Sequence, residues 1–163
     1  MKGELIMQPK NDSFKLFVDG FKPGIFLNNS SDQKFIAQLK AMNYPYSKLV
    51  KGGHLFFQKK ETCDYFEQSL LQGRKKDKNF DHYPLLSEVL GLPPCITETL
   101  KTPGKKDDFI IDYYGIIFTS PYELVVESLK WLRKTYRLPK DYPGSIEVVD
   151  RRGINYTLSP KDI

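Results

Sequence analysis

The amino-acid sequence predicts an α+β fold with a largely antiparallel sheet. Three pairs of β-rich runs are each joined by a short turn segment, which is the pattern of a β-hairpin. Segments with a helical period of apolar residues lie between these pairs. Strands and single crossover helices do not alternate regularly, so a parallel sheet is not expected. The length of 163 residues and the apolar content of 40% suit one domain, residues 1–163, with one core.

Turn residues define the three predicted hairpins. Asp19-Gly20, Gly52-Gly53 and the segment 150–153 each contain glycine, which adopts positive φ without steric cost. Pro23-Gly24 offers a competing turn, which would shorten the second strand of the first hairpin. The hairpins are predicted over residues 14–28, 48–58 and 145–158.

A further long strand is predicted over residues 109–119. Asp112 and Gly115 interrupt its apolar and β-branched sequence. Gly115 is interpreted as a β-bulge within one continuous strand. Strand alternation then places Asp112 and Tyr114 on the same face of the sheet.

Helical periodicity and end signals predict four helices between the strands. The clearest start is at Ser120, an N-cap residue followed by Pro121 and by Glu123, which completes a capping box. Gly73 and Gly91 stand where the second and third helices should end. The helices are predicted over residues 32–43, 62–72, 83–90 and 121–136.

Polar composition predicts a flexible N-terminus over residues 1–12 and charged loops at 74–80 and 101–108. No apolar run has the length of a signal-peptide core or a membrane span. The two cysteines lack the close pattern of disulfide-rich secreted domains. We therefore expect a soluble cytoplasmic protein that does not insert into membranes.

Histidine and cysteine occur only at His54, Cys63, His82 and Cys95. A zinc site usually takes its ligands in close pairs, and no two of these residues are close in sequence. Neither a metal site nor a cofactor is therefore expected. Cys63 belongs to a helical apolar stripe and is interpreted as a core residue.

Cys95 is one candidate for a reactive residue. It follows Pro93-Pro94 at a possible helix start, where the helix dipole would favour a thiolate, and His82 is a conceivable base. A single cysteine and histidine without a family signature are, however, common by chance. A cysteine without a catalytic role is therefore the stronger interpretation of Cys95, and a reactive thiol is the weaker one.

His54 and Asp112 are the other candidates for a polar or catalytic site. His54 adjoins Gly52-Gly53 and is expected at an exposed hairpin tip facing Lys51. Asp112 is either a buried carboxylate beside Tyr114 or a residue at the wet end of its strand. An enzyme using Cys95, His54 or Asp112 is the third functional hypothesis.

Basic residues gather near the end of the last predicted helix, in a chain with a net charge of +5. Cations at a helix C-terminus are favoured by the helix dipole alone. With the turn at residues 150–153 and the run Arg74 to Lys76, they could also bind phosphates. The candidate anion-binding residues are Lys130, Arg133, Lys134, Arg137, Arg151 and Arg152.

The leading hypothesis is a non-catalytic binding or regulatory protein that acts through a protein–protein interface. It depends on the absence of catalytic signatures and on ten tyrosines, a residue enriched at interfaces. The partner is then another protein, and a nucleic acid or other polyanion is the alternative. The tyrosines considered for the interface are Tyr44, Tyr46, Tyr113, Tyr142 and Tyr156.

Overall fold

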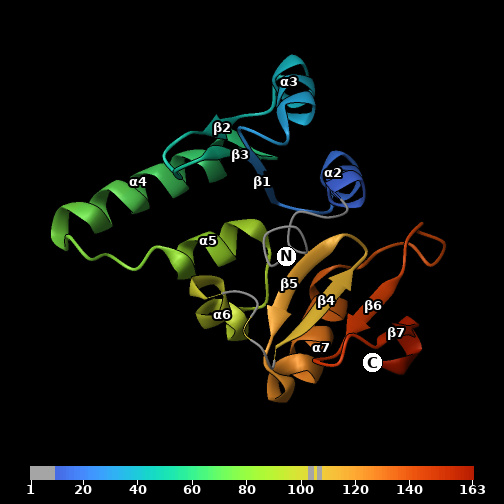
Figure 1. Ribbon diagram of the computed structural model, residues 1–163. Coiled ribbons are helices and arrows are strands. Elements are labelled where there is room, and N and C mark those ends of the chain that lie inside the picture. The colour runs from blue at the N-terminus through green and yellow to red at the C-terminus, as the bar shows by residue number, and fades with distance from the viewer. Residues whose placement is uncertain (1–9, 103–104, 106–107) are drawn as a thin grey trace. The chain divides into compact units, whose positions relative to one another are not determined.

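The α+β fold with antiparallel sheets is confirmed by a computed structural model that describes residues 10–102, 105 and 108–163 (Figure 1). The strands form one three-stranded and one four-stranded sheet, where a single sheet had been expected. Two compact units contain these sheets. The N-terminal unit is Phe17–Gly91, and the C-terminal unit joins the described residues up to Leu16 with Leu92–Ile163. The single domain expected from the chain length stays a prediction.

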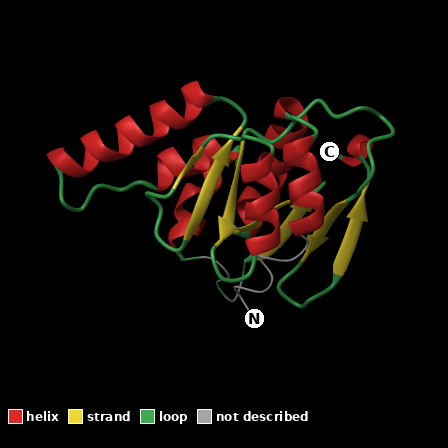
Figure 2. Ribbon diagram, turned by 90° about the horizontal axis from the view of Figure 1, so that it is seen from above, coloured by secondary structure: helices red, strands yellow, loops and turns green. Residues whose placement is uncertain are grey.

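The N-terminal unit contains the sheet β1-β3-β2, in which all neighbours are antiparallel (Figure 2). Phe26 of β1 pairs with Leu55 of the central strand, β3. All five residues of β3 are buried, as expected for a central strand covered on both faces. The elements are β1 (Gly24–Asn28), α3 (Gln33–Ala41), β2 (Tyr46–Ser47), β3 (Gly53–Phe57), α4 (Lys60–Lys76) and α5 (Tyr83–Leu90).

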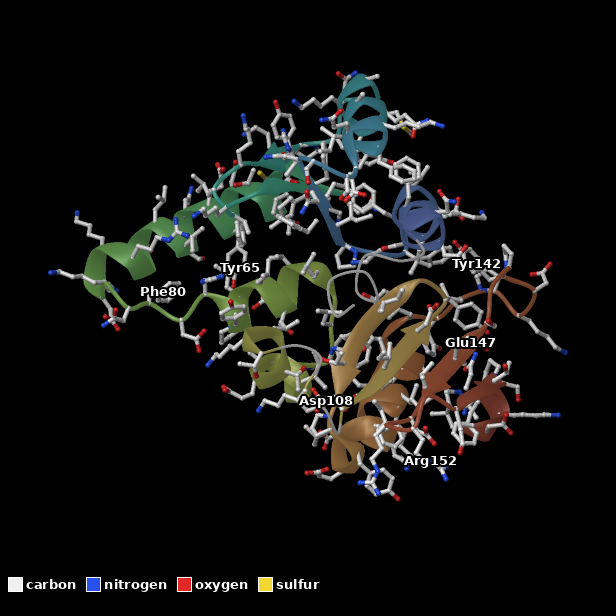
Figure 3. All side chains as sticks on the ribbon, in the orientation of Figure 1. Tyr65, Phe80, Asp108, Tyr142, Glu147 and Arg152 are labelled. Atoms are coloured by element: carbon white, nitrogen blue, oxygen red, sulfur yellow. The ribbon has the colours of Figure 1, made fainter. Side chains whose placement is uncertain are left out.

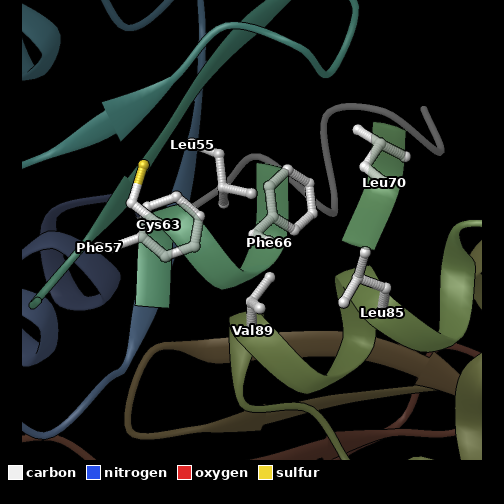
Figure 4. Packing of buried hydrophobic residues seen from close by; sticks show 7 residues of the cluster. All are labelled: Leu55, Phe57, Cys63, Phe66, Leu70, Leu85 and Val89. Atoms are coloured by element: carbon white, nitrogen blue, oxygen red, sulfur yellow. The ribbon is translucent and has the colours of Figure 1, made fainter. Parts of the chain in front are cut away.

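Apolar side chains of α4 lie between β3 and α5 and form the core of the N-terminal unit (Figure 4). Cys63 is among them, so its predicted place in the core is confirmed, and burial raises the pKa of its thiol to about 11. The ring centroids of Phe57 and Phe66 are 5.7 Å apart. The buried cluster is Leu55, Phe57, Cys63, Phe66, Leu70, Leu85 and Val89.

The C-terminal unit contains the antiparallel sheet β5-β4-β6-β7. Helix α7 contacts β4, and its buried residues Leu129 and Leu132 face inward. Ile111 and Phe118 are buried on the strands. The elements are η1 (Pro94–Ile96), α6 (Thr97–Lys101), β4 (Phe109–Tyr113), β5 (Ile116–Ser120), η2 (Tyr122–Leu124), α7 (Val125–Thr135), β6 (Ile146–Val149), β7 (Asn155–Leu158) and η3 (Pro160–Asp162).

The first predicted hairpin, residues 14–28, is wrong. Helix α2 (Lys10–Val18) replaces its first strand, and only β1 remains as a strand. Gly20, with φ of 88°, donates its N–H to the carbonyl of Phe17 at 2.9 Å. The Asp19-Gly20 signal therefore marks the end of a helix, where a left-handed glycine is equally common.

The predicted single strand over residues 109–119 is also wrong. It is a hairpin of β4 and β5, in which Tyr113 pairs with Ile116. Tyr114 and Gly115 form the turn, with φ values of 52° and 97°. Two positive φ values are the signature of a type I′ turn, so Gly115 reverses the chain and does not form a bulge. Asp112 pairs across the hairpin with Ile117.

Several boundaries also differ from the prediction. The hairpin at 48–58 is shifted, because β2 ends at Ser47 and the segment 48–52 is its loop. The capping box at Ser120 is absent; the Ser120 hydroxyl donates to the carbonyl of Pro121 at 2.9 Å, and a 3₁₀ turn precedes α7. Residues 10–12, 74–76 and 101 are helical where loops were predicted. The remainder of the predicted flexible N-terminus, residues 1–9, and residues 103–104 and 106–107 of the predicted loop lie outside the described residues.

Other elements agree with the prediction. The helix over residues 83–90 has the predicted bounds, and Gly91, with φ of 71°, ends it. The hairpin at 145–158 is formed by β6 and β7. Within the described part of the chain, no helix combines the length and the apolar character needed to cross a membrane.

Leu70→Ala should lower the free energy of unfolding of the N-terminal unit by about 2–5 kcal/mol, because it leaves a cavity in the buried cluster. The matched control is Leu71→Ala, since Leu71 is the next residue of α4 and is 53% exposed. The control should change stability by less than about 0.5 kcal/mol. Urea denaturation measures both, and equal losses in the two variants would contradict the assigned core.

Candidate anion-binding site

A pocket of about 510 Å³ lies in the C-terminal unit at the end of α7. This volume is within the range of about 300–1,000 Å³ that is usual for small-molecule sites. Residues from four regions line it: the end of β4 with its turn, the last turn of α7, the segment after α7, and η3 with the serine before it. The lining residues are Tyr113, Tyr114, Arg133, Tyr136, Arg137, Leu138, Pro139, Lys140, Ser159, Pro160 and Lys161.

The pocket lining contains four cations and no carboxylate. Arg133 donates through Nη1 to the backbone oxygen of Ile163 at 2.8 Å. Arg137, Lys140 and Lys161 have no ion pair within 4 Å in the described part of the chain. These three exposed cations are therefore available to an anion that enters the pocket.

Tyrosine rings form the other part of the lining. Tyr113 and Tyr136 are only 3% and 5% exposed. Burial raises the pKa of Tyr136. Burial and the nearby Tyr114 also raise the pKa of Tyr113, and Arg133 opposes that shift. Both phenols therefore stay neutral at physiological pH and add no negative charge to the pocket.

Tyr114 connects the pocket to the turn between β4 and β5. Its backbone N–H donates to the carbonyl of Ser145 at 3.0 Å. Its ring meets Tyr113 edge-on at 5.1 Å and Tyr142, which Figure 3 labels, at 6.3 Å between centroids. The Lys15 ammonium lies 5.4 Å from the centroid of the Tyr142 ring. Tyr114 is thus held by packing on one side and lines the pocket on another.

Arg152 is part of a closed network in the turn between β6 and β7 (Figure 3). Its Nη2 donates to Asp150 Oδ2 at 2.9 Å and to the hydroxyl of Tyr156 at 3.2 Å. Burial alone would raise the pKa of Asp150, but bonds from Arg152, Ile154 and Tyr156 lower it to about 2. The network pairs the guanidinium of Arg152 with Asp150, although Arg152 is exposed like Arg151 in the same turn.

The six predicted anion-binding residues thus have different surroundings. Arg133 and Arg137 line the pocket. Lys130 and Lys134 are exposed on α7 but are not among the lining residues. Arg151 and Arg152 belong to the turn between β6 and β7. Of the six predicted residues, only Arg133 and Arg137 therefore line the pocket.

Sequence reasoning missed Lys140, Lys161 and Ser159. The tripeptide Pro-Lys-Asp occurs at residues 139–141 and again at 160–162, but this repeat does not indicate that the two segments lie at one pocket. Proline restricts the backbone before each lysine, and both segments line the pocket. Ser159 uses its hydroxyl and its N–H to bind Asp162, in a capping box that fixes η3.

Cys95 lies in η1, and its Sγ is 3.4 Å from the hydroxyl of Ser128. Burial raises the pKa of the Cys95 thiol, and Ser128 opposes the shift. This direction is the opposite of the thiolate stabilisation expected at a helix start. No hydrogen bond joins Cys95 to Asp112 among the described residues of the C-terminal unit.

His54 is 6% exposed and lies in β3, so its predicted exposed position at a hairpin tip is wrong. Its Nδ1 is 2.7 Å from Asn29 Oδ1, and its Nε2 has no hydrogen-bond partner. Burial lowers its pKa, and nearby Lys40 and Lys48 lower it further. A neutral, buried ring packed against Tyr46 is therefore the state that this environment favours.

Asp112 is half-buried and accepts the N–H of Gly115 at 2.8 Å through Oδ1. Burial raises the pKa of Asp112, and the hydrogen bond from Gly115 opposes this increase. The neighbouring carboxylates Asp12 and Glu147 raise the pKa further. Glu147 lies directly opposite on β6, and its Oε2 is buried without a hydrogen bond. The described residues contain no group of three or more His, Cys, Asp or Glu side chains that could hold a metal ion.

Comparison with models of protein families, with curated proteins and with solved structures finds no match for this chain. Its function is therefore inferred from the residues of the pocket.

Asp150→Asn should destabilise the C-terminal unit at pH 7, because it removes the ion pair to Arg152. A carboxylate whose folded pKa is lowered to about 2 contributes stability above its unfolded pKa of about 3.9. That contribution is lost as the pH falls from about 4 to about 2, so the variant should lose less stability over this window. Urea denaturation at several pH values measures this. Asp141→Asn, at an exposed position in the 139–141 segment, is the control and should keep the acid profile of the wild type.

Asp112→Asn should have the opposite pH dependence. A carboxyl group with a raised folded pKa stabilises the fold most when protonated, and stability decreases as the pH rises through that folded pKa. The asparagine variant can keep the hydrogen bond from Gly115 and carries no charge. It should therefore lose less stability than the wild type between pH 3 and pH 7, which is about the range of the titration. A wild-type-like decrease in the variant would contradict the assigned environment of Asp112.

Proposed function

We propose that the C-terminal unit is a non-catalytic binding module that takes a small anionic ligand in the pocket at the end of α7. The observation that carries the proposal is the convergence of Arg137, Lys140 and Lys161, from two separate segments, on one pocket without an ion pair in the described residues. Bringing like charges together is unfavourable unless an anion compensates them.

The helix dipole does not account for this arrangement. It favours cations within the last turn of a helix, and Arg133 and Lys134 satisfy that preference in α7. Lys140 and Lys161 lie outside α7, in the segment 138–140 and in η3. Their presence at the same pocket therefore supports a role in binding.

Binding to nucleic acid or another polyanion is the alternative. Its support is the exposed pair Lys130 and Lys134 on α7, which could extend the charge of the pocket into a longer surface. The occupied guanidinium of Arg152 removes one of the cations on which this hypothesis relied.

A protein–protein interface retains support from exposed aromatic residues. Tyr46 and Tyr156 are 40% and 43% exposed. Tyr113, by contrast, is buried and lines the pocket, so it cannot serve an exposed surface. Tyr46 and Tyr156 are individual exposed rings, whereas the pocket combines cations with a cavity that can hold a ligand.

The pocket is tested by titrating inorganic pyrophosphate into the protein in a calorimeter. The variant Arg137→Ala/Lys140→Ala should bind about ten-fold more weakly, because each lost charge-assisted bond is exposed and worth less than its buried value of about 1.5–3 kcal/mol. The matched control is Lys34→Ala/Lys51→Ala, which removes the same charge from two exposed positions of the N-terminal unit. The control should bind pyrophosphate as the wild type does.

Equal losses in the two double variants would show a non-specific effect of net charge and would contradict the pocket. Absence of pyrophosphate binding to the wild type at low salt would contradict it as well. A third variant, Lys130→Ala/Lys134→Ala, separates the alternatives. If it weakens the binding of a single-stranded oligonucleotide and of pyrophosphate more than the pocket variant does, the polyanion surface is favoured over the pocket.

A further inference from the structure

We infer that the ligand of this pocket is a nucleoside phosphate, with its base against the ring of Tyr114 and its phosphate among Arg137, Lys140 and Lys161. The inference rests on the proposed function and adds the ligand class. It is carried by the unusual backbone of Tyr114 and by the position of its ring at a pocket lined with cations.

Tyr114 occupies a position that a tyrosine rarely takes. With φ of 52° it is in the left-handed region, where bulky side chains are outliers. The first central position of a type I′ turn favours asparagine, aspartate or glycine, and Asn-Gly is the strongest sequence for it. This chain has Tyr114-Gly115 instead. A ring retained at an unfavourable backbone position points to a role for the ring itself.

The ring of Tyr114 is held in place by its neighbours. The ring of Tyr114 meets the rings of Tyr113 and Tyr142 edge-on, with interplanar angles of 77° and 70°. Gly144 approaches closely, because a Cβ built there would lie 3.2 Å from Cδ1 of Tyr114. No parallel ring stacks on Tyr114 among the described residues. A fixed ring loses little entropy when a flat group stacks on it.

The pocket thus combines two kinds of recognition. Arg137, Lys140 and Lys161 suit a phosphate, and the Tyr114 ring suits a flat aromatic group. A nucleoside phosphate carries both groups in one molecule of a size that the pocket volume of about 510 Å³ can hold. Pyrophosphate and sugar phosphates satisfy only the cations.

The test compares adenosine 5′-monophosphate with ribose 5-phosphate, which has the same phosphate group and no base. Calorimetry on the wild type should show roughly ten-fold tighter binding of the nucleotide, because stacking of a base on an aromatic ring contributes by this order. Tyr114→Phe keeps the ring and should keep this preference. Tyr114→Asn removes the ring and should bind the nucleotide and ribose 5-phosphate with about equal affinity. Its affinity for ribose 5-phosphate should be that of the wild type.

Folding does not confuse this test, since asparagine is favoured at the turn position of residue 114. The midpoint of thermal unfolding of Tyr114→Asn should be equal to or above that of the wild type. Equal affinities of the wild type for the nucleotide and for ribose 5-phosphate would overturn the ligand class and leave anion binding intact. If neither these phosphates nor pyrophosphate binds, the proposed function fails together with the inference. A nucleotide preference that persists in Tyr114→Asn would overturn the role of the ring.

Discussion

The C-terminal unit depends on a two-residue turn between β4 and β5, in which Tyr114 and Gly115 both have positive φ. Glycine is required at the second position for two reasons. Its φ of 97° suits no L side chain, and a Cβ there would lie 2.6 Å from the backbone carbon of Asp12. The close approach of α2 is therefore possible only because residue 115 has no side chain. The same reversal positions Asp112 to accept the Gly115 N–H and places Tyr114 at the pocket.

The basic residues of this unit differ in what neutralises them. Arg152 is compensated by Asp150, and Arg133 is bound to a backbone oxygen. The cations at Arg137, Lys140 and Lys161 form no ion pair within 4 Å among the described residues, although Asp162 interacts with Lys161 at longer range. On a surface that is only generally basic, unpaired cations need not gather in one place. A binding site for an anion requires several unpaired cations close together. The net charge of +5 is therefore less informative than the arrangement of these three side chains.

Local patterns predicted the fold class and several elements, but two predicted elements were wrong and the pocket was not predicted. The fold class, the helix ending at Gly91 and the hairpin of β6 and β7 follow from periodicity and turn residues. Asp19-Gly20 predicted the wrong element, because a left-handed glycine can end a helix as well as close a hairpin. Tyr114 was read as a strand residue because its side chain gives no signal of positive φ. The pocket could not be predicted, since Lys140 and Lys161 are brought together by the path of the chain between them.

The lining of the pocket supports the proposed binding function. Its lining includes no carboxylate, histidine or cysteine, and burial keeps the phenols of Tyr113 and Tyr136 in their neutral form. Asp112, with its raised pKa, is hydrogen-bonded within the β4–β5 turn and is not among the lining residues. The cations and rings that converge on the pocket can thus hold and orient a ligand, as the proposed binding function requires.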